Sequence, residues 1–184
     1  MSWLKKLLGQ GDAAPASPPT DSAPDLAAKL LEAEKMASQL QDYLLSDKLF
    51  WQIVVDTPAG LRQPKMTLGA LYQRIQELEA RKDELGPNDR ARLAQIWQQW
   101  ETARKRFPKQ WRNKLRREYK SYLNNWKYFL EQRSSNSESW ARDYPVEVRN
   151  RERARLVLRL LGPDAADLLQ DFEKVEALDI PPRA

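Results

Sequence analysis

The chain has 184 residues, of which 41% are apolar and 31% charged, a balance typical of one globular domain with a highly solvated surface. It contains neither Cys nor His, which excludes disulfide bonds, thiol nucleophiles, Cys/His zinc sites and histidine acid–base catalysis. Because 31 Lys and Arg outnumber 26 Asp and Glu, the formal charge is +5, and the chain can attract anionic partners.

Residues 1–9 have the pattern of a short amphipathic helix, with two lysines opposite an apolar side. The apolar side consists of Trp3, Leu4, Leu7 and Leu8. About eight residues are too few for a stable isolated helix, which favours a frayed end or packing on its own domain. The functional alternative is docking on a membrane surface or a partner. Its apolar part is too short for a secretory signal, and no apolar run has the length of a membrane span.

Residues 10–24 are rich in Ala, Pro, Ser and Asp, which predicts a disordered linker before a helical domain over residues 25–184. Ser22 and Asp25 resemble a capping box. From Leu26 to Leu44, apolar residues alternate at spacings of four and three, which predicts a helix packed on an antiparallel partner.

Residues 47–55 form an apolar run too short for periodicity to separate helix from strand. Because helical patterns flank this run, we predict a helix. Residues 56–66 contain Pro58, Gly60 and Pro64, which predict a loop. No segment shows a convincing sheet pattern.

The next two helices are bounded by capping residues. Thr67 is the expected N-cap of a helix over residues 68–85. Gly86 is expected to end that helix, and Pro87 to begin the next one.

Three further helices are predicted after Pro108. This proline ends the helix that begins at Pro87, and a long helix follows it and ends near Gln132. Residues 134–144 read as a polar loop, and Pro145 as the start of a helix that runs to Leu161. Gly162 and Pro163 then repeat the stop and start before the last helix.

The stretch from residue 104 to 120 holds nine cations and one anion, Glu118. On a helical wheel at about 100° per residue, its aromatic residues share one arc and several of its cations lie near 140–180°. We therefore predict inward rings and an outward basic face. The candidate binding residues of this face are Lys109, Arg112, Arg116, Arg117 and Lys120. The alternative is a merely solvated surface, or attraction to the acidic segment after residue 160.

Arg149 and Arg153 fall inside the apolar arc of the predicted helix over residues 145–161. A buried Arg needs a partner, so we expect an internal salt bridge or an edge position. The functional alternative is a small anion pocket completed by Arg62 and Lys65.

The carboxylate pairs Asp83–Glu84 and Asp164–Asp167 could ligate a hard cation or act as acid and base, but their places at helix ends favour a structural role. Four of the seven tryptophans lie on apolar stripes and are expected in the core. Trp140 lies in the predicted polar loop and is the candidate for an exposed contact.

Together these patterns predict an all-α bundle of about six helices, without a cofactor or a metal ion. The favoured function is a non-catalytic, cytoplasmic adaptor or scaffold that docks acidic proteins or an anionic membrane surface through the basic face, with residues 3–8 as an auxiliary anchor. A nucleic-acid-binding module using phosphate contacts of the same face is the alternative. An enzyme or small-anion binder around Arg149 and Arg153 is least favoured, and self-association stays open.

Overall fold

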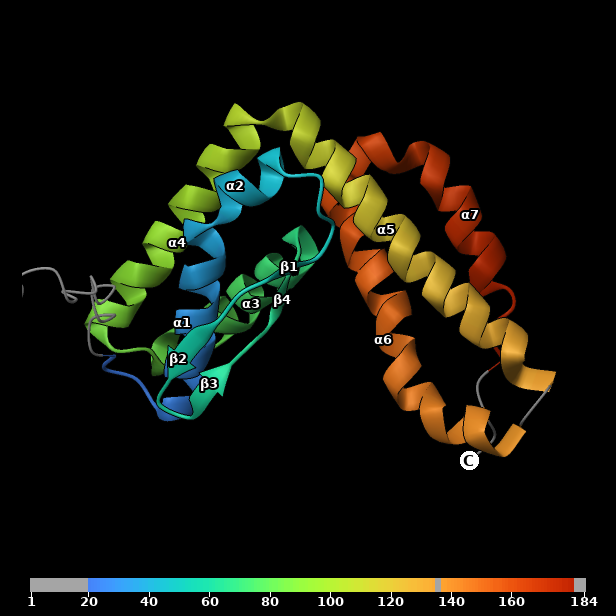
Figure 1. The fold of residues 1–184 in the computed structure, drawn as a ribbon, viewed down its shortest axis with the longest axis horizontal. Helices are drawn as coiled ribbons and strands as arrows, with labels where there is room; N and C mark the ends of the chain where they lie inside the picture. Colours follow the sequence, from blue (N-terminus) through green and yellow to red (C-terminus); the bar gives the residue numbers. More distant parts are fainter. Residues whose placement is uncertain (1–19, 135–136, 181–184) are drawn as a thin grey trace, which may run out of the picture.

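The computed structural model describes residues 20–134 and 137–180, and it is an all-α bundle, as predicted (Figure 1). Its α-helices are α1 (Pro24–Ser38), α2 (Leu40–Leu45), α3 (Leu68–Ala80), α4 (Pro87–Arg106), α5 (Pro108–Glu131), α6 (Ser137–Leu161) and α7 (Ala166–Glu176). The predicted amphipathic segment with Trp3, Leu4, Leu7 and Leu8 lies outside the described residues, as does most of the predicted linker. Among the described helices, none is both long and apolar enough to cross a membrane.

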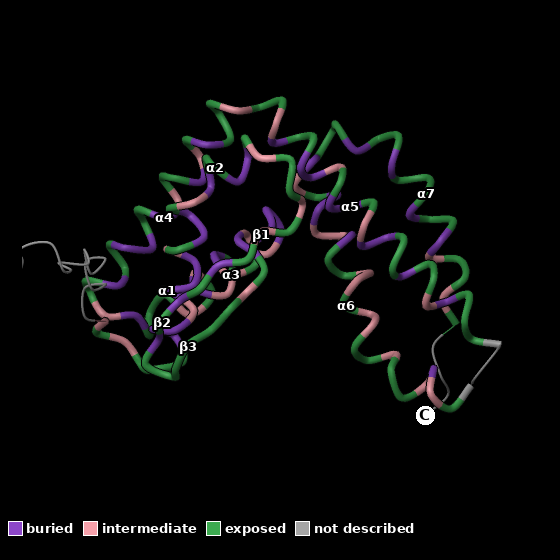
Figure 2. Tube along the Cα trace, in the orientation of Figure 1, coloured by how far each residue is buried: buried purple, intermediate pink, exposed green. Residues whose placement is uncertain are grey.

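The helices form an arch in which α1 packs against α3 and α4 on one side, while α5 crosses to α6 and α7 on the other (Figure 1). Pro108 marks the bend between α4 and α5, where the sequence predicted a break. Buried residues face the centre of each half (Figure 2).

Several helix starts and stops are where the capping residues predicted them. The Thr67 side chain accepts a hydrogen bond from the Ala70 amide at 3.1 Å and begins α3. Pro87 is the first residue of α4, and Gly162 has a φ of 56°, the left-handed conformation that ends α6. Gly86, however, caps α4 instead of α3, which already ends at Ala80.

Residues 20–23 end the predicted linker and are tied to the start of α4. The Asp21 carboxylate accepts hydrogen bonds from the amides of Asn88 and Asp89 at 3.1 and 3.2 Å. The Ser22 hydroxyl donates to the Asp89 carboxylate at 2.6 Å. This segment supplies the α4 N-terminus with acceptors that Gly86 cannot offer.

The prediction of a helix over residues 47–55 and of a loop over residues 56–66 was wrong, as was the absence of any sheet. Two short antiparallel ribbons form instead: β1 (Trp51–Gln52) with β4 (Lys65–Met66), and β2 (Val55–Thr57) with β3 (Gly60–Arg62). The side chains of Ile53, Val55 and Thr57 are buried while those between them are exposed, which is the period of a strand. Gly60, at a φ of 99°, closes the turn, and its carbonyl accepts from the Thr57 hydroxyl.

The polar loop and helix start predicted around Pro145 were also wrong, because α6 begins at Ser137 and Pro145 lies inside it. Trp140 is not an exposed contact: it is 5% exposed and stacks on Phe129 with ring centroids 5.4 Å apart. Its indole N–H donates to the Phe129 carbonyl at 3.1 Å. This aromatic packing, which also includes Tyr144, holds the first turns of α6 despite the proline.

The aromatic rings that the helical pattern placed on one side of the cationic helix face inward, as predicted, whereas Tyr128 on the same helix is 66% exposed. On α5, Trp111, Tyr119 and Trp126 are all buried. Trp111 meets Trp100 of α4 edge to face with ring centroids 4.4 Å apart. The cations of α5 are therefore distributed over its remaining surface, except for Lys114, which is buried.

Candidate anion-binding groove

The basic face of α5 is partly occupied by the acidic end of the chain. Arg112 lies 3.6 Å from an Asp164 carboxylate oxygen. Arg116 pairs with the Asp167 carboxylate and donates to the Asp164 carbonyl at 2.8 Å. The attraction between the two segments therefore operates within one chain, and two of the five predicted binding residues already have acidic partners.

The other three predicted residues of this face, Lys109, Arg117 and Lys120, form no ion pair within the described part of the chain. Lys114, by contrast, is 3% exposed. Its ammonium group donates to the Ser46 hydroxyl and the Lys48 carbonyl and lies 4.3 Å from the Tyr43 ring centroid. Burial lowers the pKa of Lys114, and this lysine anchors the segment after α2.

A groove of about 520 Å³ lies between α3 and α6 and gathers arginines that the basic face does not include. Tyr72, Gln73 and Gln76 form the α3 wall. The α6 wall consists of Val148, Arg149, Glu152, Arg153, Leu156 and Arg159. Both arginines that the sequence singled out on this helix are present, and Arg159 joins them.

The helical wheel suggested that Arg149 and Arg153 are buried, but the structure shows otherwise. Arg149 and Arg153 are exposed, because α6 turns Ala154, Val157 and Leu158 toward the core instead. The wheel took Val146 as its reference, and that side chain is 56% exposed. Of the two arrangements expected for Arg149 and Arg153, an internal salt bridge or an edge position, the salt bridge is absent from the described residues. Arg159 forms no ion pair there either.

Two neighbours set the charge of the groove. The guanidinium carbon of Arg153 lies 5.6 Å from the centroid of the Tyr122 ring, a cation–π contact from α6 to α5. Among the described residues, Glu152 is the one carboxylate that lines the groove, and it pairs with Arg151 and Arg155 at 3.1 and 3.3 Å. Because that carboxylate already has partners, the three groove arginines leave the cavity positively charged.

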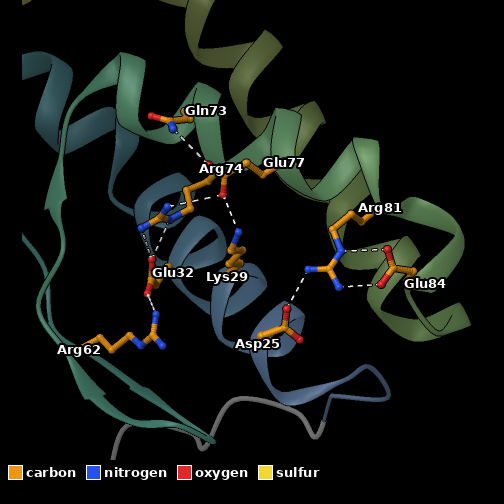
Figure 3. Close-up of polar contacts among 9 residues, drawn as sticks. All are labelled: Asp25, Lys29, Glu32, Arg62, Gln73, Arg74, Glu77, Arg81 and Glu84. Carbon is orange, nitrogen blue, oxygen red and sulfur yellow. Dashed lines mark hydrogen bonds and ion pairs between the residues drawn. The ribbon is translucent and has the colours of Figure 1, made fainter. Parts of the chain in front are cut away.

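Arg62 and Lys65 do not complete this groove, contrary to the pocket considered from the sequence. Arg62 donates to the Glu32 carboxylate at 3.1 Å, and Arg74 donates to the same carboxylate at 2.7 Å (Figure 3). The same face of α1 and α3 also carries Lys29–Glu77 and an Arg81 guanidinium shared by Asp25 and Glu84 (Figure 3). Charges are balanced in this network, which indicates a structural role.

Glu32→Ala tests that role. Glu32 is 1% exposed, and its loss leaves two arginines at a site shaped for a carboxylate. Because both arginines are partly exposed, we expect the free energy of unfolding to fall by about 2 kcal/mol, less than for a fully buried pair. Urea denaturation measures it. The matched control, Glu77→Ala in the same network, should change stability by about 0.5 kcal/mol or less, and equal effects would contradict the assignment.

Glu118 is a buried carboxylate on α5 that contacts the start of α3 and does not line the groove. It is fully buried on α5 and accepts hydrogen bonds from the Thr67 hydroxyl and from the Gly69 amide at 3.1 and 3.2 Å. The Tyr122 side chain, whose ring contacts Arg153, also acts to lower the pKa of this carboxyl group. Burial raises the pKa of Glu118 to about 7 despite these hydrogen bonds.

Sequence reasoning noted Glu118 only as the single anion among cations. Its place on the helical wheel, about 20° from Trp111 and beside the apolar arc, was the available signal that it faces inward. The remaining carboxylate pairs have structural partners: Glu84 pairs with Arg81, and Asp164 and Asp167 pair with α5. Over residues 20–134 and 137–180, no group of three or more acidic side chains is arranged to hold a metal ion.

Comparison with protein-family models, with curated proteins and with solved structures gives no match to this chain. Its function is therefore inferred from the chemistry of its own residues.

Proposed function

We propose that this chain is a non-catalytic helical interaction protein that docks an acidic protein partner in the groove between α3 and α6. The observation that carries the proposal is the convergence of Arg149, Arg153 and Arg159 on one cavity without an ion pair among the described residues. Guanidinium groups bind carboxylates with two parallel hydrogen bonds, so an acidic side chain is the natural complement of each arginine.

The proposal moves the docking site away from the α5 face that the sequence suggested. There, Arg112 and Arg116 are neutralised by the chain's own aspartates. Lys109, Arg117 and Lys120 then contribute to the general positive field, which accelerates encounter with an acidic partner more than it strengthens the bound complex. Residues 3–8 stay a predicted auxiliary anchor outside the described residues.

Binding of fluorescein-labelled poly-L-glutamate to the full chain, followed by fluorescence anisotropy, tests this proposal. We expect saturable binding that weakens as salt is added. The triple variant Arg149→Gln, Arg153→Gln, Arg159→Gln should lose about tenfold or more in affinity, because three contacts of roughly 0.5–1 kcal/mol each exceed the 1.4 kcal/mol that corresponds to a factor of ten.

The matched control is the triple variant Lys109→Gln, Arg117→Gln, Lys120→Gln, which removes the same charge from the α5 face. It should lose about threefold or less, through the weaker general field. Equal losses in the two triple variants would show that net charge alone binds the polymer, and the groove would then have no docking role.

A further inference from the structure

Arg149 and Arg153 repeat an arrangement that this chain already uses to hold an acidic helix. On α5, Arg112 and Arg116 are also four residues apart. They meet Asp164, in the 3-10 turn that leads into α7, and Asp167, in the first turn of α7. These aspartates are three residues apart, so the two charged rows lie along neighbouring helical turns.

Apolar packing completes that internal interface. Leu168 and Phe172 of α7 are buried, and the Leu168 carbonyl accepts a hydrogen bond from the Tyr119 hydroxyl of α5 at 2.8 Å. An acidic amphipathic helix is therefore held by two arginines at its edge and by apolar side chains below them.

The groove between α3 and α6 also combines arginines with apolar side chains, and no helix of the described residues occupies it. Val148 and Leu156 flank the two arginines on α6, and Tyr72 faces them from α3. All three are only partly buried, so each retains apolar surface that an occupant can cover. A ligand that carried charge alone would leave the apolar surface of these three side chains exposed to water.

The dimensions of the groove favour a helix over a single small anion. At 1.5 Å per residue, Arg149 and Arg159 lie about 15 Å apart along α6, which is nearly three helical turns. One phosphate group or a small dicarboxylate cannot reach along this row. A nucleic-acid backbone would also reach along the row, but it would leave the apolar surface of Val148 and Leu156 uncovered.

From this internal precedent we infer that the occupant of the groove is an acidic amphipathic helix of a partner protein. Its carboxylates, three or four residues apart, pair with Arg149 and Arg153, and its apolar residues cover Tyr72, Val148 and Leu156. This inference rests on the proposed docking function and specifies the partner's chemistry, a helix seated in a groove.

The test compares four labelled probes on the full chain by fluorescence anisotropy. The first is a synthetic helical peptide with glutamates four residues apart along the edge of a leucine stripe. The second is a scrambled peptide of identical composition, the third is poly-L-glutamate, and the fourth is a single-stranded oligonucleotide. We expect the helical peptide to bind about tenfold more tightly than the scrambled peptide, because only the former presents charge and apolar surface on one side.

Leu156→Gln supplies a second readout. It should weaken the helical peptide several-fold and leave poly-L-glutamate unchanged, since the polymer has no apolar side chain to place there. Circular dichroism reports whether the variant keeps its helices, and the comparison of peptides on the unmodified chain does not depend on that variant.

The outcomes separate the two proposals. If poly-L-glutamate binds through the groove arginines but the helical and scrambled peptides bind equally, the docking function stands and the amphipathic helix is excluded. If the oligonucleotide binds most tightly and depends on the same arginines, the partner is a nucleic acid, and both proposals are overturned. Failure of both peptides and of the polymer to bind would overturn both as well.

Discussion

Gly69→Ala should destabilise the chain by about 2–3 kcal/mol, although alanine is intrinsically the better helix former by up to about 1 kcal/mol. A Cβ atom at position 69 would lie 2.6 Å from the Glu118 carboxylate oxygen and 3.4 Å from a Val157 methyl group. The carboxylate cannot withdraw, because it is buried and bonded to Thr67 and to the Gly69 amide itself. The added methyl group must therefore push α3 away from α5 or break these hydrogen bonds.

Urea denaturation of a double-variant cycle measures this effect. In the background of Glu118→Ala the oxygen that blocks the methyl group is gone, so the same Gly69→Ala change should cost less than about 1 kcal/mol. A Gly69→Ala chain more stable than the original would mean that α3 and α5 do not approach as closely as described.

Local sequence signals predicted the helical part of the fold well. Thr67, Pro87 and Gly162 act within one or two turns, so their capping roles can be read without knowing what lies across the fold. The inward rings of α5 were predictable for a related reason: a helix of 24 residues repeats its apolar pattern often enough to fix the buried side.

The errors occurred where tertiary contacts override a local rule. Residues 47–55 are apolar without a clear period, and only their pairing with a segment beyond Gly60 makes a ribbon of them. Pro145 normally begins a helix, but stacking of Trp140 on Phe129 extends α6 by two turns before it. In both cases the deciding contact involves residues outside the segment being interpreted, namely residues 60–66 for the ribbons and Phe129 for the start of α6.

The candidate site was predicted only in part for the same reason. Arg149 and Arg153 were identified from one helix, but their exposure depends on which side of α6 meets α5. The opposite wall, with Tyr72 and Gln76, comes from a helix more than 60 residues earlier in the chain. Pairing of Arg116 with Asp167 could be anticipated as an attraction between segments, but not as a specific contact.

The second large effect is a dependence of stability on pH that originates at Glu118. An ordinary glutamate has a pKa of 4.5, whereas burial raises that of Glu118 to about 7 in the folded chain. Between these pH values the folded chain holds a proton that the unfolded chain releases. The contribution of this carboxyl group to stability is therefore fully present below pH 4.5 and is lost as the pH rises through 7.

Glu118→Gln removes this contribution, because an amide does not ionise while it keeps the size of the side chain and one acceptor for the Gly69 amide. We expect the difference in unfolding free energy, original chain minus variant, to be larger at about pH 5 than at about pH 8, by about 2–3 kcal/mol. Urea denaturation at a series of pH values measures both chains under identical conditions, so titration of all other groups cancels to first order. Parallel pH profiles would mean that Glu118 ionises alike in the folded and unfolded chains, which a carboxylate enclosed between α3 and α5 cannot do.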